Sequence, residues 1–463
     1  MVLVQKIVFK IKRKIIHIIF PLICKALIFC QFYNLLAYLI VQIIKISTNN
    51  FESIYNSNGL VKSQVNILVF MRGLFDKDIV EMHRKTDLKL YIFPNEYYTM
   101  LADAVLPKHL RHQLTYHHHS SNKNFQSIEL NNAMNDINYN INKDKIAKSK
   151  FESIVYKLLN YMEEKLCLHS MITSNINYYQ DQAWQKAFYK KKIKIFVLYK
   201  EFYGNKYARK QAIIMDKELG IQNMVDAIFV FCNWAKEILI ESGMAKGNNI
   251  IVTGSPRTDL IYDTFSARQN RKNLDDRLVV LFDFFETKEY SLFIDTIKIF
   301  SKMALSNKNP NIKFIIKTKY DLFSKNIQEF CQKHNITLNG IIISSNIDQK
   351  YILENTNCFI GFRTSALVEY MHTDIPILNL NWAEAEKDTD RNMFNEENVA
   401  YEMIRSPNDL KISIESIINN TMILPDGFKE ERKKIIEKFL YRIDGKRSIS
   451  IANKIINAQA VVK

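Results

Sequence analysis

Short apolar runs alternate with amphipathic helical patterns over most of this 463-residue chain. The first series of apolar runs covers residues 64–70, 88–93, 166–173, 193–199, 227–231 and 249–253. Strands separated by helices form βαβ units, in which the strands lie parallel and the helices cover both faces of the sheet. The first half of the chain is therefore predicted to form a doubly wound α/β domain.

A second series of the same kind begins near Arg277. Its apolar runs cover residues 278–282, 312–317, 340–344, 358–361 and 375–380. A chain of this length suits two domains. We predict two Rossmann-like domains, at 58–262 and 276–425, joined near residues 263–275. Residues 426–463 are predicted to be helices that can cross back to the first domain, and residues 114–149, rich in Asn, Ser and Lys, to be a long surface loop.

Residues 1–46 differ in character from the rest of the chain. Projection at 100° per residue places Lys6, Lys10, Arg13, Lys14 and His17 on one side of a helix. A basic amphipathic helix is typical of segments that lie on an anionic membrane surface. The apolar stretch that follows, 26–44, carries only a narrow polar stripe. We predict a helical membrane-associating segment; a membrane span and a helical hairpin packed on the protein are the alternatives.

The chain carries a formal net charge of +16, which favours anionic partners. No recognised nucleic-acid-binding motif accompanies this charge, so no nucleic-acid partner is predicted. None of the six cysteines shows the spacing of a zinc site, and no metal site is predicted. Neither a G-x-G-x-x-G sequence nor a phosphate-binding P-loop occurs.

The residues that follow the predicted strands are the strongest site candidates, because open parallel sheets bind ligands at the carboxyl ends of their strands. In VTGSPRTD (252–259), Arg257 can contact a phosphate and Asp259 can cap the next helix. A plain interdomain turn is the alternative. Lys317 and Lys319 follow another strand and can bind a nucleotide phosphate, or form an ordinary exposed lysine pair.

A third cluster follows the strand that ends at Gly361. Arg363, Thr364 and Ser365 open the next helix, where free backbone N–H groups favour an anion such as a donor phosphate. Glu369, one turn further on, can accept ribose or sugar hydroxyls. The alternative interpretation is an ordinary helix cap.

These segments resemble a known family. Residues 225–243 with VTGSPRTD are similar to a segment of bacterial surface-carbohydrate and capsule transferases, and of the CDP-glycerol glycerophosphotransferases of teichoic-acid synthesis. FIGFRTSALVEYMHTDIPIL (359–378) looks like the donor-site segment of these enzymes, and DGKRS (444–448) resembles their C-terminal signature. The resemblance covers roughly residues 190 to 455 and implies the GT-B architecture, a nucleotide-activated donor in the second domain and no obligatory metal or cofactor.

The sequence departs from the family at one turn. A Lys-Pro-His-Pro-like turn is usual where this chain has Lys317-Thr318-Lys319-Tyr320, and Arg363 stands where a small residue is usual. Arg363 can supply the missing cation. Glu201, just after the apolar run 193–199, resembles the Glu-Gly turn of the surface-carbohydrate enzymes and is the predicted catalytic base. Asp181 and Asp283 are weaker alternatives.

The predicted function is therefore that of a glycosyltransferase. It would move a sugar from a nucleotide-sugar donor to a surface polysaccharide or lipid-linked glycan, at the cytoplasmic face of the inner membrane, as a peripheral or monotopic protein. The alternatives are a CDP-glycerol-type polyol-phosphate transferase, which should need more cationic groups at the acceptor centre, and a non-catalytic glycan-binding or assembly protein. The sequence leaves the oligomeric state open.

Overall fold

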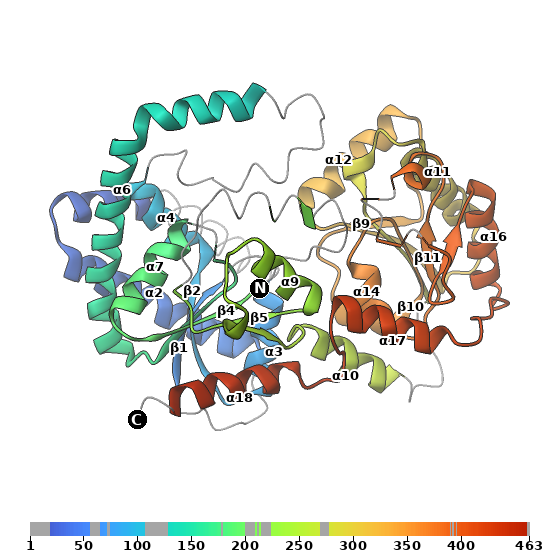
Figure 1. The fold of residues 1–463 in the computed structure, drawn as a ribbon. Helices are drawn as coiled ribbons and strands as arrows, with labels where there is room; N and C mark the ends of the chain where they lie inside the picture. Colours follow the sequence, from blue (N-terminus) through green and yellow to red (C-terminus); the bar gives the residue numbers. More distant parts are fainter. Residues whose placement is uncertain are drawn as a thin grey trace, which may run out of the picture.

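The computed structural model describes residues 19–55, 65–71, 75–106, 128–176, 179–199, 209–210, 213, 224–268, 277–388, 390, 393–394 and 396–460. Two lobes lie side by side, each built on a parallel sheet of six strands with helices on its faces (Figure 1). The prediction of two doubly wound α/β domains is confirmed.

The first sheet has the strand order β2-β1-β3-β4-β5-β6, and every described pairing in it is parallel. Its strands are β1 (Asn66–Met71), β2 (Lys89–Pro94), β3 (Ser170–Thr173), β4 (Lys194–Leu198), β5 (Ala227–Val230) and β6 (Ile250–Val252). The helices around it are α2 (Tyr33–Ile54), α3 (Phe75–Lys85), α4 (Asn95–Val105), α6 (Ile128–Leu166), α7 (Tyr179–Lys190) and α9 (Asn233–Glu241), with the short η2 (Gly247–Asn249). The central strands are buried on both faces, which is why they read as continuous apolar runs.

The second sheet has the order β12-β11-β10-β7-β8-β9. Its strands are β7 (Arg277–Phe282), β8 (Ile312–Lys317), β9 (Ile341–Ser344), β10 (Thr356–Gly361), β11 (Ile377–Leu380) and β12 (Glu402–Ile404). Its helices are η3 (Phe285–Thr287), α11 (Ser291–Ser306), α12 (Asp321–Lys333), α13 (Gln349–Asn355), α14 (Ala366–Tyr370), α15 (Glu384–Lys387), α16 (Pro407–Ile418) and α17 (Phe428–Phe439). Counted from β7, this order is 3-2-1-4-5-6, the Rossmann order, and it reverses between β7 and β10.

Two local expectations differ from the structure. The three-residue strand β12 was not predicted, because so short a run carries no recognisable pattern. Residues 128–149, predicted to be loop, belong to the 39-residue helix α6. Met134, Ile137 and Ile141 recur there at helical spacing, but the high Asn content obscured that signal.

The N-terminal helices pack on the first lobe. Leu36, Ala37, Ile40 and Ile44 of α2 are fully buried in its core, and the Thr48 hydroxyl accepts a hydrogen bond from the amide of Ile92 on edge strand β2, at 2.9 Å. The predicted membrane-associating segment is therefore not supported for α2, and the packed-helix alternative holds there. Of the described helices, none has the length and apolarity needed to cross a membrane. The basic face at Lys6 to His17 lies outside the described residues.

The end of the chain crosses between the lobes. Helix α10 (Thr258–Arg268), which follows β6, places Ile261 and Phe265 in the core of the second lobe together with residues of α17. Helix α18 (Arg447–Ala460) then returns to the first lobe, where Ile451 and Ile455 pack in a core cluster with residues of β1 and α3 (Figure 1).

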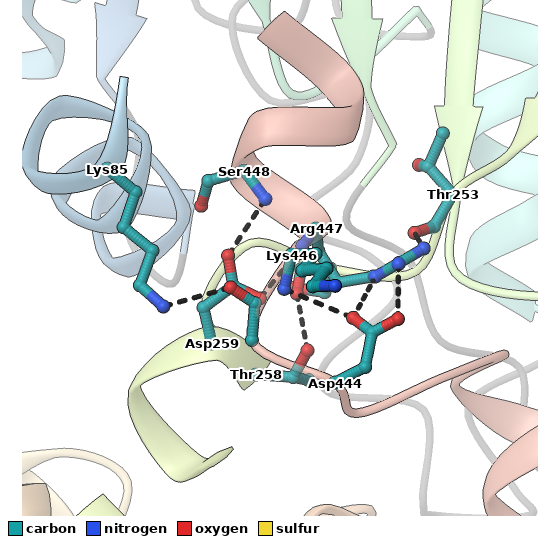
Figure 2. A network of polar contacts seen from close by, with 10 residues as sticks. Lys85, Thr253, Thr258, Asp259, Asp444, Lys446, Arg447 and Ser448 are labelled. Carbon is teal, nitrogen blue, oxygen red and sulfur yellow. Dashed lines mark hydrogen bonds and ion pairs between the residues drawn. The ribbon is translucent and has the colours of Figure 1, made fainter. Parts of the chain in front are cut away.

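A buried carboxylate anchors this crossing. Asp259 was expected to cap the helix that follows it, but it lies inside α10 and caps α18 instead, accepting the amides of Arg447 at 2.9 Å and Ser448 at 2.8 Å (Figure 2). The Arg447 guanidinium donates to the Thr253 carbonyl at 3.1 Å and to the Asp444 carboxylate at 2.6 Å and 2.9 Å. The segments 252–259 and 444–448, nearly 200 residues apart in sequence, thus form one interlobe clamp.

Two glycines make the clamp possible. Gly254 and Gly445 both have positive φ, at 76° and 71°. A Cβ at Gly254 would lie 2.8 Å from a side-chain carbon of Arg447, and one at Gly445 would lie 2.7 Å from the Tyr262 ring. Backbone conformation and close approach both require glycine at these positions.

We predict that Asp259→Ala lowers the free energy of unfolding by about 2 kcal/mol or more, because two buried amides lose their acceptor. Urea denaturation of the purified protein measures this value. Asp263→Asn is the matched control: its carboxylate forms a partly exposed ion pair with Lys85 and should contribute less than about 1 kcal/mol. Equal effects of the two substitutions would contradict the capping role of Asp259.

Candidate functional site

The carboxyl ends of β7, β8 and β10 form the rim on which most predicted site residues lie. Phe282 of β7 is level with Lys317 of β8 in the sheet register, and the amide of Asp283 donates to the Lys317 carbonyl at 3.0 Å. Gly361 ends the adjacent β10. Ligands of open α/β sheets bind at such a reversal of strand order.

The structure brings Arg257 and Glu369 into direct contact. The Arg257 guanidinium forms an ion pair with Oε1 of Glu369 at 2.9 Å, and both side chains are largely buried. The other side of Arg257 faces the first lobe, where Oδ1 of Asp78 on α3 accepts its amide at 3.0 Å and also accepts the Ser255 hydroxyl. Arg257 therefore links the two lobes, through its backbone amide to Asp78 and through its guanidinium to Glu369.

Burial and mutual attraction compete in this chain of charges. Burial alone would lower the pKa of Arg257, but the Glu369 and Asp78 carboxylates outweigh it and raise that pKa, so the guanidinium stays charged. Burial raises the pKa of Asp78 despite the opposing effects of Arg257 and Ser255. The Arg257 side chain also lies over the Phe231 ring, with 5.1 Å between the guanidinium carbon and the ring centroid.

Lys317 is a half-buried ammonium at the same rim. Its Nζ donates to the Thr318 carbonyl at 3.3 Å and to the Ser345 carbonyl. Burial, followed by the nearby charge of Lys77, lowers the pKa of Lys317 to about 8, although Asp321 opposes this shift. Lys77 belongs to α3 of the first lobe and donates to Oε1 of Gln349 in the second lobe at 3.0 Å.

The remaining predicted residues take different environments. Lys319 is exposed and lies 5.3 Å from the ring centroid of its neighbour Tyr320. The Thr364 hydroxyl accepts the Ala366 amide at 3.2 Å, whereas the Ser365 side chain makes no cap hydrogen bond. Helix α14 has only five residues, so its N-terminus is a weaker anion site than that of a longer helix would be. A Cβ at Gly361 would lie 2.9 Å from Thr364, so the turn needs a glycine.

Arg363 lies in a polar cluster of the second lobe. Its backbone is left-handed, with φ at 54°, and its guanidinium pairs with the Asp388 carboxylate. The guanidinium carbon is 5.5 Å from the Tyr290 ring centroid, and the Tyr290 hydroxyl donates to Oδ2 of Asp388 at 3.1 Å. The structure therefore pairs Arg363 with a carboxylate that the sequence analysis did not identify.

The candidates for the catalytic base occupy different parts of the chain, and the structure describes only two of them. Glu201 lies outside the described residues, and its role stays a prediction. Asp283 is at the rim, and its Oδ1 accepts the Phe285 amide at 2.7 Å. Asp181 is only 1% exposed in the first turn of α7. Of these two alternatives, only Asp283 lies at the strand ends where a donor is expected.

Over the described residues, no group of three or more His, Cys, Asp or Glu side chains is arranged to hold a metal ion.

A groove of about 870 Å³ runs along edge strand β12, between the loop 397–401 and residues 421–425. None of the predicted site residues lines this groove. We therefore place the candidate site at the carboxyl ends of β7, β8 and β10, where the charged residues lie, and not in the groove.

Comparisons with known proteins give structural similarity alone. No protein-family model and no curated protein matches the sequence. A wall teichoic acid polymerase, TagF, is similar in structure at 10% identity and a TM-score of 0.48, over 92% of this chain and 98% of that one. The UDP-GlcNAc 2-epimerase of Methanocaldococcus jannaschii is similar at 12% identity and a TM-score of 0.46, over 85% and 99%. The UDP-GlcNAc 2-epimerase of Neisseria meningitidis is similar at 12% identity and a TM-score of 0.44, over 85% of this chain and 100% of that one.

With TM-scores below 0.5, these likenesses support no statement about activity. The class of the chain follows from its own geometry. Two Rossmann-like sheets in tandem, with a C-terminal helix that returns to the first lobe, make a two-domain α/β fold of GT-B-like architecture.

Four residues of this region were not predicted from the sequence. Lys77 and Asp78 lie in the first turn of α3, and Gln349 and Asp388 are contributed by the second lobe. Asp78 and Lys77 follow β1 closely, so their place near a strand end was a usable signal. Gln349 and Asp388 carry no local signal, because only the tertiary arrangement brings them to Lys77 and Arg363.

We predict that Arg257→Met lowers the free energy of unfolding by about 3 kcal/mol, because the buried Glu369 carboxylate loses its ion-pair partner and Asp78 loses a nearby positive charge. Urea denaturation at pH 7 measures the effect, and adding Glu369→Gln in the same chain should recover part of the loss. Lys325→Ala removes an exposed pair with Glu329 and should cost at most about 0.5 kcal/mol. An Arg257→Met protein as stable as this control would show that the ion chain does not hold the lobes.

Proposed function

We propose that this protein is a metal-independent, cofactor-independent glycosyltransferase that moves a sugar from a nucleotide-activated donor to a surface polysaccharide or lipid-linked glycan. The single observation that carries the proposal is the convergence of cations on the switch point of the second sheet. Lys317 lies at the rim itself, Arg257 enters from the interlobe segment, and Lys77 reaches in from the first lobe.

Each residue has a proposed part. Lys317 and Arg257 bind the donor phosphates, with Lys319 and Arg363 at the edge of the site. Gly361, Thr364 and Ser365 let the donor approach the backbone at the start of α14. Glu369 holds Arg257 through Oε1 and accepts a donor hydroxyl at Oε2. Glu201 deprotonates the acceptor.

A CDP-glycerol-type polyol-phosphate transferase is the second candidate, and one observation favours it. Phosphoryl transfer should need additional positive charge where donor and acceptor meet. Lys77 supplies such a charge from the first lobe, and the sequence analysis had not counted it. The choice between sugar and polyol-phosphate therefore depends on the donor that binds.

Thermal unfolding in the presence of UDP, GDP, CMP, CDP and CDP-glycerol tests the proposal. A ligand that binds only the folded protein raises its stability by about 2.7 kcal/mol at a hundredfold excess over the dissociation constant. We expect one nucleotide class to raise the melting temperature of the wild type, and Lys317→Met to remove most of that rise. Lys325→Gln, at an exposed position on α12, should keep it.

Turnover is then assayed with the sugar or polyol derivative of that nucleotide. Glu201→Gln should retain the thermal shift and lose about a hundredfold or more in kcat, the size of a general-base contribution. A selective shift with CDP-glycerol alone would establish the second candidate. No shift with any nucleotide, from a protein that melts cooperatively, would contradict both and favour a non-catalytic glycan-binding or assembly protein.

We further propose an anionic membrane surface as a partner, at the cytoplasmic face of the inner membrane. The first 51 residues contain seven Lys or Arg and no acidic residue. In the part of this region that the structure describes, Leu22, Phe29, Phe32 and Leu35 are 61%, 87%, 59% and 51% exposed. Exposed apolar side chains in a segment that is rich in Lys and Arg suit the headgroup region of an acidic bilayer.

Co-sedimentation with vesicles checks this partner. The wild type should pellet with vesicles that contain phosphatidylglycerol and stay in solution with phosphatidylcholine alone. Phe29→Ser with Phe32→Ser should reduce binding about tenfold, whereas Ile423→Ser, which is also highly exposed but lies in the second lobe, should not. Equal binding to both vesicle types would contradict an electrostatic contribution.

A further inference from the structure

Lys77 connects the two lobes at the candidate site. It lies in the first turn of α3 in the first lobe, and its Nζ donates to Oε1 of Gln349 in the second lobe at 3.0 Å. Gln349 also hydrogen-bonds to the hydroxyl of Tyr370, the residue after Glu369. The Gln349 side chain therefore holds the ammonium of Lys77 against the second lobe.

Lys77 and Lys317 are two positive charges without a direct carboxylate partner among the described residues, although Asp321 partly offsets the charge of Lys317. None of the ion pairs found among the described residues includes either lysine, and their hydrogen-bond partners are neutral: the Gln349 amide for Lys77, and the carbonyls of Thr318 and Ser345 for Lys317. Asp321, the carboxylate near Lys317, accepts the Ser345 hydroxyl and the Asn346 amide. The repulsion between the lysines contributes to the lowered pKa of Lys317, about 8.

Two like charges held near each other by different lobes are stabilised by an anion that contacts both. A single carboxylate would satisfy one ammonium, whereas a diphosphate has two phosphoryl groups and more negative charge to share. We propose that Lys77 of the first lobe and Lys317 of the second together bind one diphosphate group, so that the anion ties the lobes together. This inference rests on the proposed function in that it assigns the donor's diphosphate to the lysine pair.

The proposal makes Lys77 a binding residue contributed by the lobe that is not expected to hold the donor. It also couples binding to a proton. The anion stabilises the charged form of Lys317, so binding favours the protonated lysine. As pH rises through about 8, the free protein loses that proton, and the affinity for the anion should fall.

Inorganic pyrophosphate is the probe, because it tests the lysine pair without assuming a base or sugar. Calorimetric titration of the full-length protein at pH 7.5 should give about tenfold weaker binding for Lys77→Gln, since one charge-assisted contact is lost. Lys77→Arg keeps the charge and should stay within about threefold of the wild type. Lys325→Gln, an exposed lysine on α12, should bind as the wild type does. Because Lys77 is exposed, Lys77→Gln is expected to fold normally.

The pH dependence of pyrophosphate affinity distinguishes binding by the Lys77–Lys317 pair from nonspecific binding to a surface charge. Lys317→Arg remains charged at all pH values used, so the ratio of wild-type to Lys317→Arg affinity cancels the ionisation of pyrophosphate itself. That ratio should fall between pH 7 and 9, with its midpoint near 8. In the Lys77→Gln background the midpoint should move to higher pH, because the repulsion is gone. A flat ratio, or wild-type binding by Lys77→Gln, would overturn the proposal, as would failure of the wild type to bind pyrophosphate.

Failure of this inference and failure of the proposed function can be told apart. If pyrophosphate shows the predicted dependence on Lys77 and no nucleotide binds, the anion site stands and the transferase proposal falls. If a nucleoside diphosphate binds equally well to the wild type and to Lys77→Gln, the transferase proposal stands and the lysine pair is excluded as its phosphate site.

Discussion

One buried cation, Arg257, holds the two lobes in register, and the candidate site depends on it. Its amide and its guanidinium contact carboxylates from different lobes, Asp78 and Glu369. A buried charge is costly unless it is paired, so the lobes cannot separate here without exposing or orphaning charged groups. The same contact fixes Glu369 at the edge of the second sheet, one residue from Tyr370. The candidate site and the interlobe junction therefore share the residues Arg257 and Glu369.

The crossing C-terminal helix is the second constraint on the lobes. Asp259 lies two residues after Arg257 and caps α18 through the amides of Arg447 and Ser448. A change in the segment 253–259 would thus alter both the ion chain and the clamp. This segment, for which the sequence allowed either a phosphate contact or a plain interdomain turn, therefore carries contacts that join the two lobes. Lys77 and Lys317 belong to the two lobes that it joins, and we propose that an anion bridges them.

Local patterns were sufficient to predict most of the fold. The buried strands of both sheets are parallel and covered by helices, so they appear as continuous apolar runs, and the strand-end rule placed Lys317 and Gly361 on the correct rim. Long-range pairing was not predictable: Asp259 was assigned to its own helix rather than α18, and Arg363 was expected to be available to a ligand although Asp388 pairs with it. Such pairings depend on tertiary contacts, and the local sequence around each residue contains no pattern that predicts them.

The central claim is that a nucleotide-activated donor binds at the carboxyl ends of β7, β8 and β10. The most direct measurement is a crystal structure of the full-length protein with the nucleoside diphosphate that stabilises it most. We expect the diphosphate at Lys317, within reach of Lys77, with the ribose on the side of Glu369. A nucleotide bound instead in the groove of about 870 Å³ along β12 would contradict it.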